Sequence, residues 1–117
     1  MTDLQSLMNQ VKNFCEERDW DQFHGPKDLA IGISTEASEL LEIFRFLSPQ
    51  EEVALMNGSR RIEVGEELAD ILFMILRFAQ KNDFDLNECF QKKMIRNAQK
   101  YPVELARGSN VKYNRRL

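Results

Sequence analysis

Apolar residues recur every three or four positions through most of this chain of 117 residues, which is the period of one face of an α-helix. The chain has only five glycines and three prolines, and no stretch alternates apolar and polar residues as a half-exposed strand does. The pattern therefore predicts an all-α fold. The expected helices cover about residues 4–15, 26–47, 49–57, 59–81 and 86–101.

A chain of this length fits a single domain with one core. We expect residues 1–102 to form a four-helix bundle with one short extra helix, and residues 103–117 to form an irregular C-terminal arm. Every apolar run is interrupted by charge, so we expect no membrane partner. No signal peptide is evident, and two cysteines without a disulfide framework favour a cytoplasmic location.

Charge is divided unevenly along the chain. From Cys89 onward there are eight basic residues and a single acid, Glu104, whereas the first 88 residues hold 18 acidic and eight basic residues. This division suggests a site whose charges are matched within the chain, or one that takes a metal ion together with an anion, although an acidic surface with a solvated basic tail has the same composition. The formal net charge of -3 argues against binding to a nucleic-acid polymer.

Two pairs of acidic residues fall on or beside the apolar faces of the second and third long helices. They are Glu36 with Glu39, and Glu67 with Asp70. None of the four has a Lys or Arg three or four positions away on its own helix, where an ion-pair partner would normally lie. Ionised carboxylates in such positions are costly without positive charge. An all-oxygen ligand set suits Mg²⁺, with Mn²⁺ as a substitute.

Other interpretations of these acids stay open from the residues alone. The four carboxylates could line a wet helix face, or form ion pairs with Lys93 or Lys100 on the fourth long helix. A di-iron centre of the bundle type needs Glu-x-x-His pairs on its helices. The only histidine, His24, lies in an expected loop, which excludes that kind of site.

The two acidic pairs and their spacing resemble those of the all-α nucleoside triphosphate pyrophosphohydrolases, the MazG-like superfamily. The resemblance is greatest to the dCTP pyrophosphatase branch and covers residues from about 10 to 113, in order and at matching spacing. The segments that carry it are Glu17-Arg18-Asp19-Trp20-Asp21-Gln22-Phe23-His24, Glu66-Glu67-Leu68-Ala69-Asp70, Lys93-Met94-x-x-Asn97-x-x-Lys100-Tyr101-Pro102 and Leu105-Ala106-Arg107-Gly108-Ser109 with Lys112-Tyr113.

This resemblance implies Mg²⁺-dependent hydrolysis of a nucleoside triphosphate between its α and β phosphates, which releases the monophosphate and pyrophosphate. The implied substrate is dCTP or a modified dCTP, and the implied role is house-cleaning of the nucleotide pool. It also implies a homodimer or homotetramer, which agrees with apolar residues spread beyond a single helix face. Broader specificity, a preference for dUTP, and a non-catalytic helical interaction module are the alternatives.

Site residues are carried over from the family by position. Glu36, Glu39, Glu67 and Asp70 would bind Mg²⁺, and either Glu36 or Glu39 would orient or deprotonate the attacking water. The residues that would contact the substrate are Trp20, Gln22, His24, Phe46, Met74, Lys93, Asn97 and Lys100.

From the residues alone, the loop residues and the polar residues of the last long helix each have an alternative interpretation. Trp20 and Phe23 could close the end of the bundle as core residues, with His24 as a helix-entry residue. The face that carries Lys93, Asn97 and Lys100 at helical spacing could simply be solvated.

Three positions depart from the branch's pattern. Phe46 stands where the branch has Trp, Met74 where it has Tyr, and Val11 where it has His. These departures leave the acidic pairs untouched but put the base and sugar preference in doubt.

Overall fold

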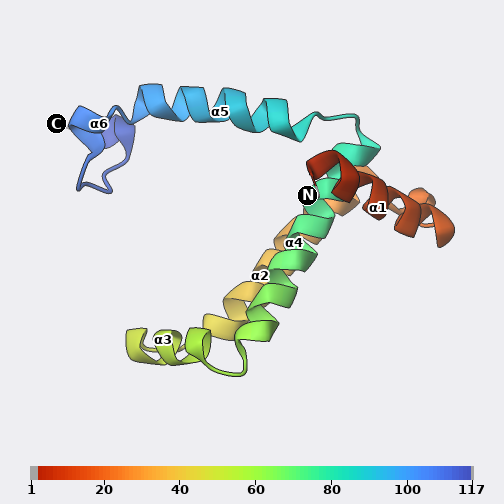
Figure 1. Cartoon of the computed structure of the whole chain (residues 1–117), viewed down its shortest axis with the longest axis horizontal. Helices are drawn as coiled ribbons and strands as arrows, with labels where there is room; N and C mark the ends of the chain where they lie inside the picture. Colours follow the sequence, from red (N-terminus) through yellow and green to blue (C-terminus); the bar gives the residue numbers. More distant parts are fainter. Residues whose placement is uncertain (1–2, 117) are drawn as a thin grey trace. The chain divides into compact units, whose positions relative to one another are not determined.

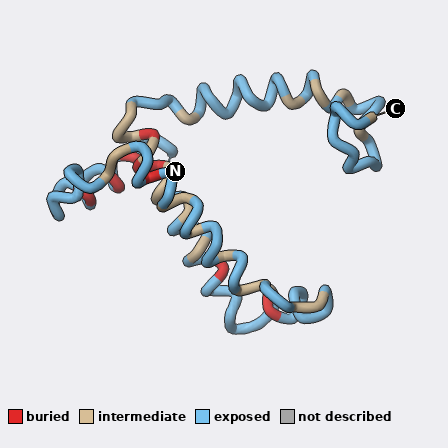
Figure 2. Tube along the Cα trace, turned by 180° about the vertical axis from the view of Figure 1, so that it is seen from behind, coloured by how far each residue is buried: buried red, intermediate tan, exposed pale blue. Residues whose placement is uncertain are grey.

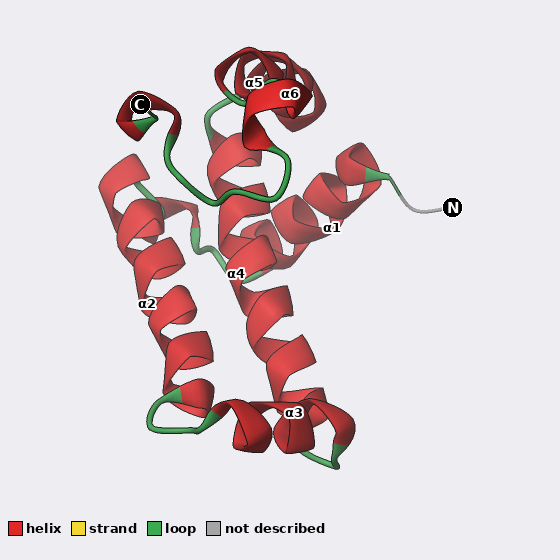
Figure 3. Cartoon of the chain, turned by 90° about the vertical axis from the view of Figure 1, so that its left-hand side faces the viewer, coloured by secondary structure: helices red, strands yellow, loops and turns green. Residues whose placement is uncertain are grey.

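The computed structural model describes residues 3–116, and in this range it contains six α-helices, two short 3-10 helices and no β-strand (Figures 1 and 3). This confirms the predicted all-α class. The elements in chain order are α1 (Leu4–Glu17), η1 (Asp21–Phe23), α2 (Pro26–Phe44), α3 (Pro49–Asn57), α4 (Arg61–Lys81), α5 (Leu86–Lys100), α6 (Val103–Ala106) and η2 (Tyr113–Arg115).

The chain divides into two units, of which the first ends at Asp83 and the second begins at Phe84. The first unit holds three of the expected long helices, α1, α2 and α4, together with the short extra helix α3. Within it α4 is central, because α1, α2 and α3 all pack against it. Helices α2 and α4 run side by side (Figures 1 and 3). The second unit holds α5 and the C-terminal arm.

The core of the first unit lies chiefly where α1 and the start of α2 pack on the last turns of α4 (red in Figure 2). Full burial of a Val, Leu or Met side chain stabilises the fold by about 1.5–3 kcal/mol, before the entropy of ordering is subtracted. The buried apolar residues are Met8, Val11, Cys15, Leu29, Leu55, Val64, Leu76 and Ala79.

Two helix starts follow directly from the capping residues in the sequence. Ser48 and Glu51 form a reciprocal capping box at the start of α3, with Pro49 in the first turn. The carboxylate of Asp85 accepts a hydrogen bond from the backbone N–H of Glu88 and so caps α5. Both starts were expected from the sequence.

The expected end of α2 near Leu47 is wrong, because the helix stops at Phe44. Phe46 has a φ of 69°, in the left-handed region that continues no right-handed helix. The N–H of Leu47 donates to the carbonyl of Phe44 at 3.1 Å and closes this turn.

The C-terminal arm has more regular structure than expected, because it contains α6 and η2. The ring of Tyr113 packs edge-on against the ring of Tyr101, with centroids 5.9 Å apart. The guanidinium of Arg116 donates to the carbonyl of Lys100 at 2.6 Å. The arm is therefore tied to the last turn of α5.

No helix among residues 3–116 is both long enough and apolar enough to cross a bilayer.

Candidate metal centre and the adjoining loop

Four carboxylates converge between α2 and α4. Glu36 and Glu39 come from α2, and Glu67 and Asp70 come from α4. One carboxylate oxygen from each residue lies within 4.8 Å of the corresponding oxygens of the other three. Glu36 and Glu67 are half-buried, whereas Glu39 and Asp70 are exposed. The structure therefore brings together all four residues that the sequence predicted as metal ligands.

The convergence follows from helix geometry and from a close approach of the two helices. A spacing of three residues puts both acids of each pair on one face of their helix. One turn before Glu36, α2 carries Gly32, and a Cβ placed there would lie 2.8 Å from the sulfur of Met74 on α4. The missing side chain of Gly32 thus makes room for Met74 between the helices, next to the acidic residues.

The electrostatics of this cluster are unfavourable without a ligand. The Oε2 atoms of Glu36 and Glu67 are buried and have no hydrogen-bond partner. Burial, and then the neighbouring Glu39 carboxylate, raises the pKa of Glu36 and also that of Glu67. Within the first unit, no Lys or Arg among the described residues forms an ion pair with any of the four. Buried polar atoms that lack partners are rare in proteins and need an explanation.

The donor set fits a hard divalent cation. Such ions prefer oxygen ligands, and carboxylates can supply several of them at one site. A bound cation would give the orphaned oxygens of Glu36 and Glu67 a partner and would remove the repulsion among the four negative charges. The cluster can therefore hold a metal ion.

The loop between α1 and α2 carries three of the predicted substrate residues, Trp20, Gln22 and His24. The Trp20 ring packs edge-on against Phe14 at 5.6 Å and against His24 at 6.0 Å, between ring centroids. Trp20 is 37% exposed and Phe23 62% exposed, so neither belongs to the buried core of the first unit. The amide nitrogen of Gln22 lies 3.1 Å from both the carbonyl and the carboxylate of Asp19, which keeps its hydrogen bonds within the loop.

Arg77, which was not among the predicted site residues, anchors this loop to α4. Its side chain is completely buried. Its Nε donates to Nδ1 of His24 at 3.0 Å, one terminal nitrogen donates to Oε1 of Gln80 at 2.6 Å, and the other donates to the carboxylate of Asp21. Nearby, the ammonium of Lys81 donates to the carbonyl of Asp21 at 2.7 Å. Arg77 meets only one part of the criterion that identified the acids, because it has no acid three or four positions away but falls opposite the apolar stripe of Val64 and Ile71 on a helical wheel.

The remaining predicted substrate residues of the first unit are Phe46 and Met74. Phe46 is 87% exposed, and the guanidinium of Arg45 lies 4.6 Å from its ring centroid. A bulky residue in the left-handed region is strained, and such strain is often found at functional sites. Met74 is half-buried. Val11, the third departure from the branch's pattern, lies on α1 and is buried in the core of the first unit.

Lys93, Asn97 and Lys100 lie on α5, in the second unit. Lys93 is exposed, whereas Asn97 and Lys100 are half-buried. The ammonium of Lys100 lies 4.9 Å from the centroid of the Tyr113 ring. Their contact with a substrate stays a prediction.

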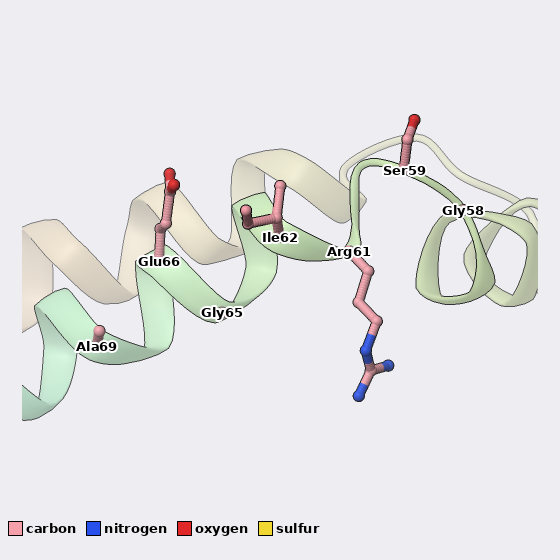
Figure 4. A pocket seen from close by; sticks show the side chains of 7 residues that line it. All are labelled: Gly58, Ser59, Arg61, Ile62, Gly65, Glu66 and Ala69. Atoms are coloured by element: carbon pink, nitrogen blue, oxygen red, sulfur yellow. The ribbon is translucent and has the colours of Figure 1, made fainter.

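A hollow of about 610 Å³ lies along the first turns of α4, and none of the predicted site residues is among those that line it (Figure 4). In this view the side chains of Ser59 and Glu66 point to one side and that of Arg61 to the other. The residues that line it are Gly58, Ser59, Arg61, Ile62, Gly65, Glu66 and Ala69.

Residues 31–115 match the sequence model of the MazG-like family, a range that includes the whole acidic cluster. The dCTP pyrophosphatase 1 of Bos taurus is 38% identical over 112 residues, which are 94% of this chain and 66% of the relative. The Rattus norvegicus protein of the same name is 36% identical over 111 residues, again 94% of this chain but 65% of the relative. The chain thus spans slightly less than two thirds of the length of these relatives.

A solved structure has a similar fold. It is a pyrophosphatase from Archaeoglobus fulgidus DSM 4304, with a TM-score of 0.80 at 36% sequence identity. The similarity covers 87% of this chain and 94% of that one.

Proposed function

Because the chain belongs to the MazG-like family, we propose that it is a nucleoside triphosphate pyrophosphohydrolase that depends on Mg²⁺. The proposed reaction cleaves between the α and β phosphates and releases a nucleoside monophosphate and pyrophosphate. The names of the curated relatives and of the similar solved structure support this class of reaction. Their names also favour dCTP, or a modified dCTP, as the substrate.

The observation that carries the proposal is the cluster of four carboxylates with two buried oxygens that lack hydrogen bonds. Glu36, Glu39, Glu67 and Asp70 would hold the metal ion, with Mn²⁺ as a possible substitute. When bound, a divalent ion neutralises charge on the phosphates and lowers the pKa of a coordinated water. Glu36 or Glu39 would orient the attacking water and accept its proton.

The predicted substrate residues supply aromatic, apolar and polar groups. Trp20 and Phe46 offer exposed aromatic faces on which a base can stack, and Met74 adds apolar surface beside the acidic cluster. Lys93, Asn97 and Lys100 would donate to triphosphate oxygens. Gln22 and His24 would contribute polar contacts from the loop.

The wider biological setting belongs to the same proposal. We place the enzyme in the cytoplasm, acting in nucleotide-pool sanitation, with the two units working as one domain. Self-association as a homodimer or homotetramer is supported by exposed apolar side chains on α2 and α4, such as Leu41 and Leu68. A membrane or a nucleic-acid polymer is not among the proposed partners.

The deciding experiment is a panel of ribonucleoside and deoxyribonucleoside triphosphates, with Mg²⁺ or Mn²⁺ and identification of the products. We expect dCTP to give dCMP and pyrophosphate, and chelation to abolish the reaction. Equal rates across the panel would support broad specificity, and a higher rate with dUTP would change the assigned base. No hydrolysis of any triphosphate with either metal would favour the non-catalytic interaction module.

Glu39→Gln tests the site itself. We expect a loss of activity of about a hundredfold or more, because the variant loses a metal ligand and a proton acceptor. Glu42→Gln is the matched control, since Glu42 lies three residues further along α2 and pairs with Arg45 at 3.0 Å in an exposed position. Glu39→Gln with the wild-type rate would contradict the assignment of the acidic cluster.

A further inference from the structure

We propose that Arg77 is a positioning residue that holds His24 as a neutral imidazole with its proton on Nε2, so that His24 presents only a hydrogen-bond donor to the nucleotide. The contact of His24 with a nucleotide rests on the proposed function, whereas the state of the imidazole rests on the contacts described above.

The state of the ring follows from the donor and acceptor chemistry of the pair. A guanidinium has five N–H donors and no acceptor. Since Nε of Arg77 lies 3.0 Å from Nδ1 of His24, Nδ1 must accept this hydrogen bond and therefore carries no proton. A neutral imidazole without a proton on Nδ1 carries it on Nε2, on the other side of the ring.

Arg77 is itself held in place, so it acts as a fixed donor. Its terminal nitrogens bond Gln80 on the same helix and Asp21 in the loop, and its side chain has no exposed surface. A rotation that released His24 would leave buried donors without partners, at a large cost in free energy. The guanidinium fork thus joins α4 to two residues of the loop at once.

The surrounding charges also favour the neutral ring. Arg77 and Lys81 face His24 from α4, while Asp21 in the loop and Asp28 on α2 supply the opposing negative charge. Burial, followed by the two cations, lowers the pKa of His24. Protonation of Nδ1 would place two N–H donors against each other and lose the hydrogen bond with Arg77.

This arrangement limits what His24 can recognise. A fixed N–H donor can bond a ring carbonyl oxygen of a pyrimidine or a phosphate oxygen, but it cannot accept from the exocyclic amino group of cytosine. His24 therefore cannot distinguish cytosine from uracil by accepting from that amino group. Any such distinction must come from other residues.

The test uses the fact that His24 is the only histidine in the chain, so its ring nitrogens give an unambiguous NMR signature. In the wild-type protein without nucleotide, at about pH 7, we expect a non-protonated Nδ1 and a protonated Nε2. A protonated Nδ1, or a mixture of the two neutral forms, would overturn the proposal. This measurement needs no substrate, so it stands even if the proposed enzymatic activity fails.

Arg77→Met tests the role of the guanidinium, with circular dichroism as a check on folding. We expect the variant to populate both neutral forms of His24 and to raise its pKa toward the ordinary value of 6.5. Lys81→Met is the matched control, because it removes a neighbouring cation that bonds Asp21 and makes no hydrogen bond to His24. It should keep the wild-type form of the ring. An unchanged ring in Arg77→Met would refute the positioning role.

The contact with nucleotide is tested separately, with an α,β-methylene analogue of dCTP. We expect the Nε2–H resonance of the wild-type protein to shift on titration, and KM for dCTP in Arg77→Met to rise about tenfold with a smaller change in kcat. If dCTP is hydrolysed but the Nε2–H resonance does not respond to the analogue, His24 is not a donor to the nucleotide. That result would overturn this part of the proposal while leaving the proposed function intact.

Discussion

Helix α4 contributes to two polar clusters that differ in whether their buried charged groups have hydrogen-bond partners. At Glu67 it helps to form the acidic cluster, where two buried oxygens have no hydrogen-bond partner and the neighbouring charges are of the same sign. At Arg77 it forms a cluster in which the buried cation donates to Gln80, His24 and Asp21. The first cluster is incomplete without a ligand, whereas the second is satisfied by the chain itself.

This difference separates a binding site from a positioning site. A buried charge without a partner lowers stability, and it is retained where a ligand supplies the missing interaction. A buried charge with its full set of partners orients the groups around it. An added cation is therefore expected to raise stability through the acidic cluster. Removal of any side chain of the Arg77 cluster is expected to lower stability.

Glu36→Gln should produce the largest effect and should separate function from stability. We expect activity on dCTP to fall by about a hundredfold or more, because a ligand of the proposed metal ion is lost. Without divalent ions, the same variant should be more stable than the wild type by about 1 kcal/mol, because one of four mutually repelling carboxylates becomes neutral. Rate assays, and urea unfolding with and without Mg²⁺, measure the two quantities.

Mg²⁺ should stabilise the wild type more than Glu36→Gln. If Glu36→Gln were less stable than the wild type without metal, the Glu36 carboxylate would already have a stabilising partner. The two clusters would then not differ in the way described.

Arg77→Met should have the next largest effect, on stability. We expect the free energy of unfolding to fall by about 2 kcal/mol, because the buried hydrogen bonds to Gln80 and His24 are lost. Denaturant unfolding measures this loss, and the exposed Arg60, which pairs with Glu63 at 2.6 Å, offers Arg60→Met as a control with a change below about 0.5 kcal/mol. Equal effects in the two variants would show that burial of Arg77 contributes nothing.

The smallest expected effect is that the two clusters change the free energy of unfolding with pH in opposite directions, measured without divalent ions. The raised pKa values of Glu36 and Glu67 mean that the folded state binds more protons, so this cluster should lower stability as pH rises above the ordinary value of 4.5. The lowered pKa of His24 means that the unfolded state binds more protons, so the Arg77 cluster should raise stability with pH until the ordinary value of 6.5 is passed.

Urea unfolding over a pH series tests these opposite slopes. Glu36→Gln should weaken the fall in stability with pH, and His24→Gln should remove the rise. If either variant kept the wild-type profile, the pKa shift of that residue would not govern stability.

The periodicity of apolar residues was enough to predict the all-α class and the approximate positions of the helices, because helix formation depends on local spacing and on capping residues such as Ser48 and Asp85. The end of α2 was misplaced because the apolar pattern continues through Leu47, while the chain turns at Phe46. A left-handed residue other than glycine leaves little trace in a sequence pattern.

The sequence by itself determined that two pairs of carboxylates share helix faces and have no cation on their own helices, since both properties depend only on helical geometry. Tertiary packing alone decided that the pairs meet within 4.8 Å and that Arg77 reaches His24, 53 residues earlier in the chain. The physical reason is that the spacing of residues along a helix sets the direction of each side chain, whereas the atom that it meets is set by the packing of one helix against another.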